Sequence, residues 1–295
     1  MSILSLRNVV KQYSNHLAVN HISFDVEKNK IFGLLGPNGA GKTSLIRIIT
    51  TITGADEGDI FIDGEKLNIH HPKQIGYMPE ERGLYKKMKV GEQLMYLAQL
   101  KGMNTSEAKD KIGFWLKKFD ITDWWNKKIE ELSKGMQQKI QFIATGVHEP
   151  KLIILDEPFS GLDPINTNLI KEEIRKLKEN GTSIIFSTHR MEQVEEICED
   201  IVLINQGQVV LQGNVDKIKH DFKENKYKVE FEGDLPDFSN YNVVEQTENS
   251  VIVQLEQGEE GNELLKYVVH AGTHITGFNE LLPSLNEIFI KQVES

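Results

Sequence analysis

Residues 36–43 read Gly36-Pro37-Asn38-Gly39-Ala40-Gly41-Lys42-Thr43, which matches the phosphate-binding loop pattern G-x-x-x-x-G-K-[ST]. In such a loop the glycines let backbone N–H groups point at a triphosphate, Lys42 reaches the outer phosphates, and the Thr43 hydroxyl completes a Mg²⁺ shell. An apolar run at 31–35 precedes the loop, and a helical pattern that starts at Ser44 follows it. The N-terminal end of a helix dipole would then face the phosphates. The stretch predicts a strand, a nucleotide-binding loop and a helix, in that order.

Two adjacent carboxylates follow a second apolar run, residues 152–155. Four aliphatic residues in a row favour a parallel strand that is buried on both faces. Ligands collect at the carboxyl ends of such strands, so Asp156 is expected to hold Mg²⁺ and Glu157 to polarise an attacking water. On an extended strand the two side chains would diverge, because successive residues point to opposite faces.

The chain resembles the nucleotide-binding subunits of ATP-binding cassette (ABC) transporters over about its first 215 residues. Leu132-Ser133-Lys134-Gly135-Met136 is similar to the family signature Leu-Ser-Gly-Gly-Gln, with Lys134 at the first glycine and Met136 at the glutamine. A serine and a glycine at the start of a helix provide an N-cap and free N–H groups for an anion. The resemblance implies that Ser133, Lys134 and Gly135 contact the γ-phosphate of ATP that is held by a partner subunit.

Three further elements of the resemblance occur in the expected order. Ser160-Gly161-Leu162-Asp163 resembles the D-loop that crosses the dimer interface, which implies a contact of Asp163 with the partner's site. His189 follows an apolar run as the family's switch histidine does, which implies a contact with the γ-phosphate and the catalytic water. Tyr13 lies where the family places an aromatic ring that stacks on adenine; taken alone, it would be an edge-strand aromatic residue.

One position in the predicted site departs from the family pattern. Glu80 follows Pro79 where most relatives have a glutamine that ligates Mg²⁺. A carboxylate is also a hard oxygen ligand for Mg²⁺, but it adds a negative charge beside ATP. The run Pro79-Glu80-Glu81-Arg82-Gly83-Leu84-Tyr85 is similar to a variant in exporters that resemble sodium and drug efflux subunits.

Composition argues for a cytosolic enzyme at a membrane rather than for a nucleic-acid binder. The 34 Lys and Arg residues against 44 Asp and Glu leave a net charge of −10, which does not attract phosphate backbones. We find no run of roughly 20 apolar residues and no signal peptide pattern, so the permease is expected to be another chain. The single cysteine, Cys198, is expected to pack in a helical pattern with Val194, Ile197 and Ile201 in a reducing compartment.

The fold class that these patterns predict is α/β, a P-loop cassette with an inserted helical subdomain and a small α+β C-terminal domain. Residues 1–215 are expected to form the ATP-binding domain, with strands at 31–35, 152–156, 183–187 and 201–205. Residues 88–148 lack strand alternation and show apolar positions at helical spacing, so they are expected to form the insertion. Its three tryptophans, Trp115, Trp124 and Trp125, are expected mainly in its core.

The C-terminal domain is expected to span residues 226–295, after a charged stretch at 217–226. Alternating patterns near 227–231 and 251–255 predict two strands that are buried on one face. Helices are expected at 261–270 and after Pro283, where Ser284 and Glu287 form a capping box. The run 283–289 resembles the tail of the C-terminal domain of the same exporters, and its expected role is to stabilise the dimer or the fold, or to regulate.

Taken together, these patterns predict an ATPase that powers export through a separate integral-membrane permease at the inner face of the cell membrane. Two identical or related subunits would sandwich ATP and Mg²⁺, with Thr43, Glu80 and Asp156 as metal ligands and Glu157 and His189 as catalytic residues. One alternative is a soluble cassette ATPase in translation or DNA repair, although one phosphate loop and one cysteine argue against it. Another is a weakly hydrolytic regulatory module, which Lys134, Met136 and Glu80 would allow.

Overall fold

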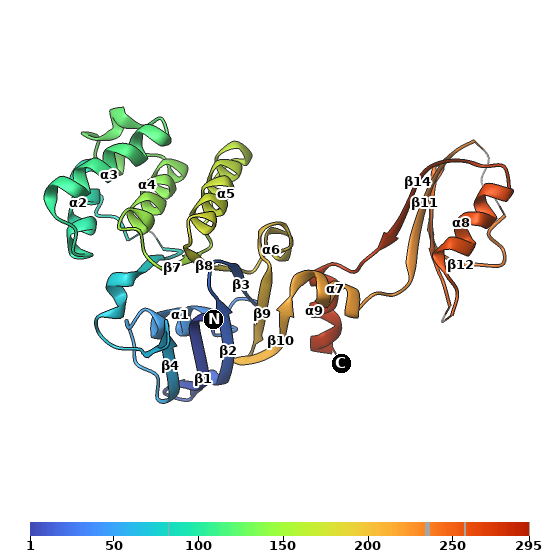
Figure 1. Ribbon diagram of the computed structural model, residues 1–295, viewed down its shortest axis with the longest axis horizontal. Helices are drawn as coiled ribbons and strands as arrows, with labels where there is room; N and C mark the ends of the chain where they lie inside the picture. The colour runs from blue at the N-terminus through green and yellow to red at the C-terminus, as the bar shows by residue number, and fades with distance from the viewer. Residues whose placement is uncertain (82, 234–236, 257, 295) are drawn as a thin grey trace. The chain divides into compact units, whose positions relative to one another are not determined.

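The computed structural model describes residues 1–81, 83–233, 237–256 and 258–294, in two compact units (Figure 1). The first unit is Met1–Asn214 and the second is Val215–Ser295. The second unit begins earlier than the expected position near residue 226, because the charged stretch forms helix α7 (Val215–Asp221). This helix buries Val215 and Ile218 and leaves its charged residues between them at the surface.

A six-stranded sheet with the order β10-β9-β3-β8-β7-β6 forms the centre of the first unit. Its strands are β3 (Ile31–Leu35), β6 (Ile75–Met78), β7 (Leu152–Asp156), β8 (Ser183–Thr188), β9 (Asp200–Asn205) and β10 (Gln208–Asn214). All neighbours are parallel except β9 and β10. Every residue of β3, β7 and β8 is buried, as expected for parallel strands that are covered on both faces. Because β8 lies between β3 and β7, the segments that follow these three strands leave the same edge side by side.

An antiparallel sheet with the order β2-β1-β4-β5 lies across helix α1 (Lys42–Ile49) from the central sheet (Figure 1). Its strands are β1 (Ser2–Tyr13), β2 (His16–Glu27), β4 (Glu57–Ile62) and β5 (Glu65–Lys66). Leu45, Ile46 and Ile49 of α1 pack in one core with apolar residues of both sheets, such as Leu4 and Leu34. The helix that begins at the phosphate loop is therefore fixed on two sides. A short 3₁₀ helix, η1 (His71–Gln74), leads from this sheet into β6.

The segment between β6 and β7 is helical in the structure, as the sequence predicts. It contains α2 (Val90–Leu100), α3 (Thr105–Lys118), the 3₁₀ helices η2 (Thr122–Trp124) and η3 (Ile129–Glu131), and α4 (Lys134–Gly146). Figure 1 shows α2, α3 and α4 gathered away from the antiparallel sheet. Trp115 is buried against Phe119 and Phe142, and the ring of Trp125 lies directly on Gly91. These two tryptophans therefore pack in the helical subdomain.

Helices α5 (Pro164–Glu179) and α6 (Met191–Ile197) connect β7 to β8 and β8 to β9. Cys198 follows the last residue of α6, whereas Ile201 belongs to β9, so the single helical pattern expected through both residues is wrong. The helix ends there because the chain turns into the parallel sheet. The thiol is buried beside Gly33 of β3, in agreement with the expected packing role.

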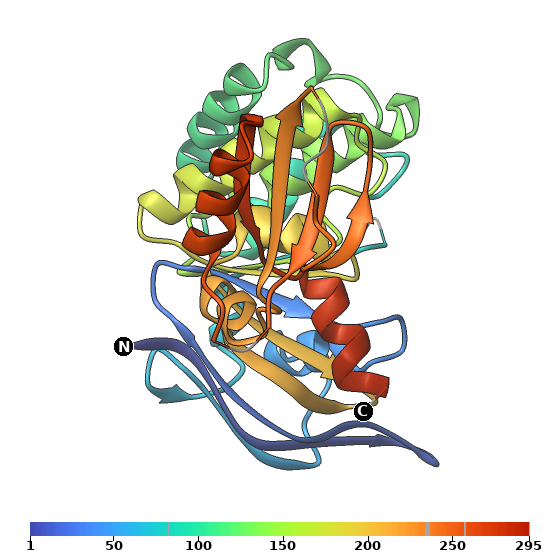
Figure 2. The same cartoon turned by 90° about the vertical axis from the view of Figure 1, so that its right-hand side faces the viewer.

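The second unit is an α+β domain around one antiparallel sheet, with the order β12-β13-β11-β14. Its elements are α7, β11 (Lys226–Glu232), β12 (Asn242–Gln246), β13 (Ser250–Gln254), α8 (Gly261–His270), β14 (His274–Leu281) and α9 (Leu285–Glu294). Helix α8 covers the face that buries Val229, Phe231 and Val253 (Figure 2). Ser284 and Glu287 form the expected capping box. The backbone N of Ser284 lies 2.7 Å from Oε2 of Glu287, and the backbone N of Glu287 lies 3.2 Å from Oγ of Ser284.

The expectation of only two strands in this unit is wrong, because β12 and β14 form the two sheet edges. All five residues of β12 are exposed, so this strand lacks the one-sided apolar alternation from which the other strands were predicted. None of the helices in the described part of the chain combines the length and the apolar character that crossing a bilayer requires.

Candidate active site

The phosphate loop and the carboxyl end of β7 line a cavity of about 210 Å³ in the first unit. Eleven of the predicted site residues line it: Tyr13, Asn38, Gly39, Ala40, Gly41, Lys42, Thr43, Ser44, Glu80, Asp156 and Glu157. Tyr13, at the end of β1, is partly exposed, with a relative accessibility of 40%. A flat ring therefore borders the opening of a pocket whose base is the phosphate loop.

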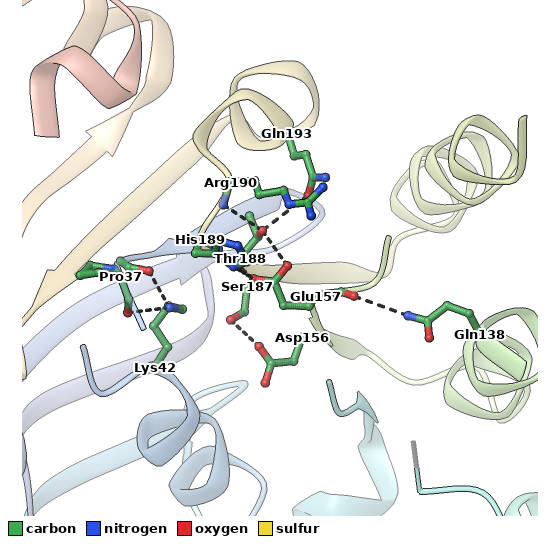
Figure 3. Close-up of polar contacts among 11 residues, drawn as sticks. Pro37, Lys42, Gln138, Asp156, Glu157, Ser187, Thr188, His189, Arg190 and Gln193 are labelled. Atoms are coloured by element: carbon green, nitrogen blue, oxygen red, sulfur yellow. Dashed lines mark hydrogen bonds and ion pairs between the residues drawn. The ribbon is translucent and has the colours of Figure 1, made fainter. Parts of the chain in front are cut away.

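The Lys42 ammonium lies inside its own loop (Figure 3). Its Nζ donates to the carbonyl oxygen of Gly36 at 2.6 Å and to that of Pro37 at 3.1 Å. Burial lowers the pKa of Lys42, and the negative charges of Glu157, Asp156 and Glu80 oppose this effect. The loop therefore presents a desolvated cation whose bonds to neutral carbonyls are open to exchange for an anion.

Gly41 fixes the path of the backbone into α1. It is the N-cap of the helix with φ of 108°, and a Cβ there would lie 2.2 Å from the carbonyl oxygen of Ala18. Only glycine combines this backbone conformation with so close an approach of β2. The first N–H groups of α1 consequently face the cavity without an intervening side chain.

Asp156 ends β7 and points into the cavity opposite Lys42. Its Oδ1 accepts a hydrogen bond from the Ser187 hydroxyl at 2.7 Å, across the registered pair of β7 and β8. Burial raises the pKa of Asp156, although this hydrogen bond favours the charged form. A cation beside Asp156 would relieve that cost of burial.

Glu157 does not continue the extended strand, so the expectation that strand pleating sets the direction of its side chain relative to Asp156 is wrong. Its φ is 49°, in the left-handed region that glutamate rarely adopts, and its N–H donates to the Ser187 carbonyl at 2.9 Å. That bond and the bonds to its side chain hold the turn in place. The turn, rather than strand pleating, directs the carboxylate toward the end of β8.

The end of β8 binds the Glu157 carboxylate through three donors (Figure 3). Oε1 lies 2.9 Å from the backbone N of His189 and 2.6 Å from its ring Nδ1, while Oε2 accepts from the Thr188 hydroxyl at 3.0 Å. An ionised carboxylate is an acceptor only, so Nδ1 carries the proton and Nε2 is the ring nitrogen left for another partner. His189 and Glu157 therefore form one hydrogen-bonded unit.

The predicted signature and D-loop residues lie outside this cavity. Ser133 is the N-cap of α4 and accepts from the Met136 N–H at 3.3 Å, while Lys134 and Gly135 form the first turn. Asp163 is the N-cap of α5 and accepts a hydrogen bond from the Asn166 N–H at 3.0 Å. Hydrogen bonds from the backbone and the side chain of Asn166 lower the pKa of Asp163. The structure thus separates these residues from the phosphate loop of their own chain.

Sequence reasoning missed several residues that shape the site. His16 and Ala18 of β2 line the cavity, and Gln138 and Gln141 of α4 donate to the backbone beside two of the site carboxylates. Two glutamines three residues apart among the apolar positions of a helix were the available signal for the last two.

Comparisons with known proteins identify the family of the chain. Residues 19–160 match the family described as ABC transporter, and residues 213–293 match the C-terminal domain of DrrA1-3-like ATP-binding proteins. The ABC transporter ATP-binding protein YhaQ of Bacillus subtilis (strain 168) is 44% identical over 294 residues, covering 99% of this chain and 98% of that protein.

Two comparisons bear on the kind of transporter and on the fold. The ATP-binding protein NatA of B. subtilis is 36% identical over 205 residues, 68% of this chain and 83% of that protein. A solved ATP-binding subunit of an ABC transporter has a TM-score of 0.70 at 29% identity, covering 75% of this chain and 93% of that chain. The expected cassette fold and C-terminal domain are confirmed, and the chain belongs to the ABC transporter family as an ATP-binding subunit.

Proposed function

We propose that the chain hydrolyses ATP to power export through a separate membrane permease. The observation that carries this proposal is the position of Glu157, whose carboxylate lines the same cavity as Lys42 and the phosphate loop. The family supplies the reaction class, since its cassettes are ATPases. Export rests on the names of two relatives, the linearmycin resistance ATP-binding protein LnrL at 36% identity and the lipopolysaccharide export system ATP-binding protein LptB at 31% identity.

The residues divide the chemistry between charge stabilisation and proton transfer. Lys42 and the N–H groups of α1 offset the charge that develops on the transferred phosphoryl group. A carboxylate has about four acceptor positions, and three donors occupy three of them in Glu157. The remaining position is on Oε2, which we assign as the atom that takes the proton of the attacking water.

The donor set fits Mg²⁺. Asp156, Glu80 and the Thr43 hydroxyl all line one cavity and offer hard oxygen atoms. In the described ranges no cluster of three or more His, Cys, Asp or Glu side chains could hold a metal on its own. This fits an ion that completes its shell with phosphate oxygens and water, as Mg²⁺ does in nucleotide sites. When bound, Mg²⁺ would neutralise phosphate charge and orient the γ-phosphoryl group.

A second subunit, identical or related, would complete the site. Ser133, Lys134 and Gly135 begin α4 with free N–H groups, and we propose that they contact the outer phosphate of the partner's ATP, with Asp163 near the same interface. The chain would work at the cytoplasmic face of the membrane, held there by the permease.

The test is purification of the tagged chain from gently solubilised membranes, followed by identification of what accompanies it and by an ATPase assay. A multi-spanning protein together with ATP turnover that Glu157→Gln removes is the expected result. A pool that is entirely cytosolic and bound to ribosomes would favour a soluble cassette ATPase, and nucleotide binding without turnover would favour a regulatory module.

A further inference from the structure

Helix α4 contacts two loops that each carry a carboxylate of the site. One loop follows β6 and contains Glu80, and the other follows β7 and contains Glu157. The amide of Gln141 donates to the carbonyl oxygen of Pro79 at 2.7 Å, and that of Gln138 donates to the carbonyl oxygen of Pro158 at 2.9 Å. Pro79 immediately precedes Glu80, and Pro158 immediately follows Glu157. The two contacts are therefore one peptide bond away from two proposed functional groups.

Both glutamines are buried, with relative accessibilities of 3% for Gln138 and 4% for Gln141. A spacing of three residues places them on one face of the helix. A buried amide that lacks a partner is costly, so each position favours an apolar residue unless its hydrogen bond has a role. Only the NH₂ group of a glutamine can donate to a carbonyl, so the acceptors fix the orientation of both amides.

The two acceptor carbonyls, those of Pro79 and Pro158, are well placed to transmit the position of α4 to the carboxylates beside them. The planar peptide bond places the carbonyl of Pro79 in one plane with the backbone nitrogen of Glu80, and the fixed φ of Pro158 limits how its backbone can turn relative to Glu157. The far end of α4 is also fixed to the sheet, because a Cβ on Gly76 of β6 would lie 2.3 Å from the Thr145 carbonyl oxygen. Helix α4 and the two loops therefore form one packed unit.

The N-terminus of the same helix carries Ser133 and Gly135. A Cβ on Gly135 would lie 3.4 Å from the carbonyl oxygen of Gly161, so this end also contacts the segment after Glu157. A displacement of the first turn of α4 is thus passed along a stiff helix to Pro158 and Pro79.

We infer that Gln138 and Gln141 are positioning residues that link the Ser133–Gly135 segment to Glu157 and Glu80 within one chain. The inference rests on the proposed function, in which these carboxylates serve hydrolysis and Mg²⁺. If Ser133 contacts the partner's ATP, the link couples the occupancy of one site to the geometry of the other.

The test uses Gln138→Met and Gln141→Met in the full chain, since methionine keeps the volume and removes the donor. Gln138→Met should lower kcat by about 10- to 100-fold with KM for ATP within about twofold, because Glu157 shifts while the phosphate loop is untouched. Gln141→Met should raise the Mg²⁺ concentration for half-maximal binding of a fluorescent ATP analogue by about tenfold. Gln137→Met is the matched control, because its amide donates to Ile129 and Leu132 instead.

A double-mutant cycle separates positioning from general stability. If Gln141 acts through Glu80, Gln141→Met should have no further effect on the Mg²⁺ dependence in a Glu80→Gln background. An equal effect in both backgrounds, or variants that differ from wild type only in melting temperature, would overturn the inference. A wild-type chain that hydrolyses no ATP would refute the proposed function, while the binding titrations would still decide the role of Gln141.

Discussion

The Lys42 ammonium donates to the Gly36 carbonyl oxygen at 2.6 Å, so the phosphate loop is closed around its own cation. Nucleotide binding must exchange this bond, and the one to Pro37, for phosphate oxygens. The exchange is favourable because the partly desolvated ammonium then faces full negative charges instead of the dipoles of two neutral carbonyls.

Lys42→Met should therefore abolish nucleotide binding while it leaves the fold intact. It removes a buried ammonium whose direct bonds are to neutral carbonyls, so the melting temperature without nucleotide should change by less than about 4 °C. Wild type should gain about 2.7 kcal/mol of stability at an ATP concentration 100 times Kd, and the variant should gain almost none. Thermal melts with and without Mg·ATP measure both quantities.

Glu157→Gln should lower the ATPase rate by about 10² to 10⁴, which corresponds to roughly 3–5 kcal/mol of barrier. The amide oxygen still accepts from His189, so nucleotide binding should persist and an ATP-bound dimer should accumulate on size exclusion. Glu172→Gln, at an exposed acidic residue of α5, is the control and should hydrolyse normally. A Glu157→Gln chain within a few-fold of wild type would shift the role of base to His189.

Glu80→Gln should weaken the dependence of nucleotide binding on Mg²⁺ and leave hydrolysis in place. The change removes one negative charge beside Lys42 and Asp156, so less cation is needed to offset the triphosphate. Magnesium titrations of a fluorescent ATP analogue give the comparison. Unchanged titrations would show that Glu80 faces away from the ion.

Mixed subunits test whether the site is completed by a partner. Lys42→Ala chains lose phosphate binding, and Ser133→Arg chains place a bulky group at the first turn of α4. A mixture of the two should restore at most one working site per pair, and the wild-type rate per chain should rise more steeply than linearly with dilute protein concentration. A monomer with the full rate in sedimentation experiments would exclude the shared site.

The free energy of unfolding should decrease as the pH is lowered from about 6.5 to 4, because of His148. Burial, together with the charges of Lys101 and Lys111, lowers its pKa from 6.5 to about 4. The unfolded chain therefore binds the proton first as pH falls below 6.5, and up to about 3 kcal/mol is lost by the time pH reaches the folded pKa. Urea unfolding at pH 7 and pH 5 should show about 2 kcal/mol of this loss in wild type.

The control pair for this experiment is His148→Phe and His270→Gln. The first should lose this part of the pH dependence, and the second, at an exposed helix end, should keep it. Equal slopes in all three proteins would exclude His148 as the group responsible.

The sequence was sufficient for the central strands and the residues of the phosphate loop, because buried parallel strands and a glycine-rich loop leave strong local patterns. It was insufficient for Glu157, whose left-handed backbone depends on β8, a strand about 30 residues farther along the chain. Strand β12 was missed because its exposed residues carry no apolar alternation. The role of Gln138 and Gln141 could not be predicted, because their acceptors, the carbonyls of Pro158 and Pro79, come close to them only in the folded chain.

The left-handed backbone at Glu157 also affects how the stability of variants at this position should be interpreted. A β-carbon in this conformation costs about 1–2 kcal/mol, which glycine would not incur. Glu157→Gly would relieve this strain but would also remove the three hydrogen bonds that the carboxylate accepts, so the two effects on stability oppose each other. The melting temperature of a variant at this position therefore does not report its turnover, and a library sorted for robustness alone would retain inactive proteins.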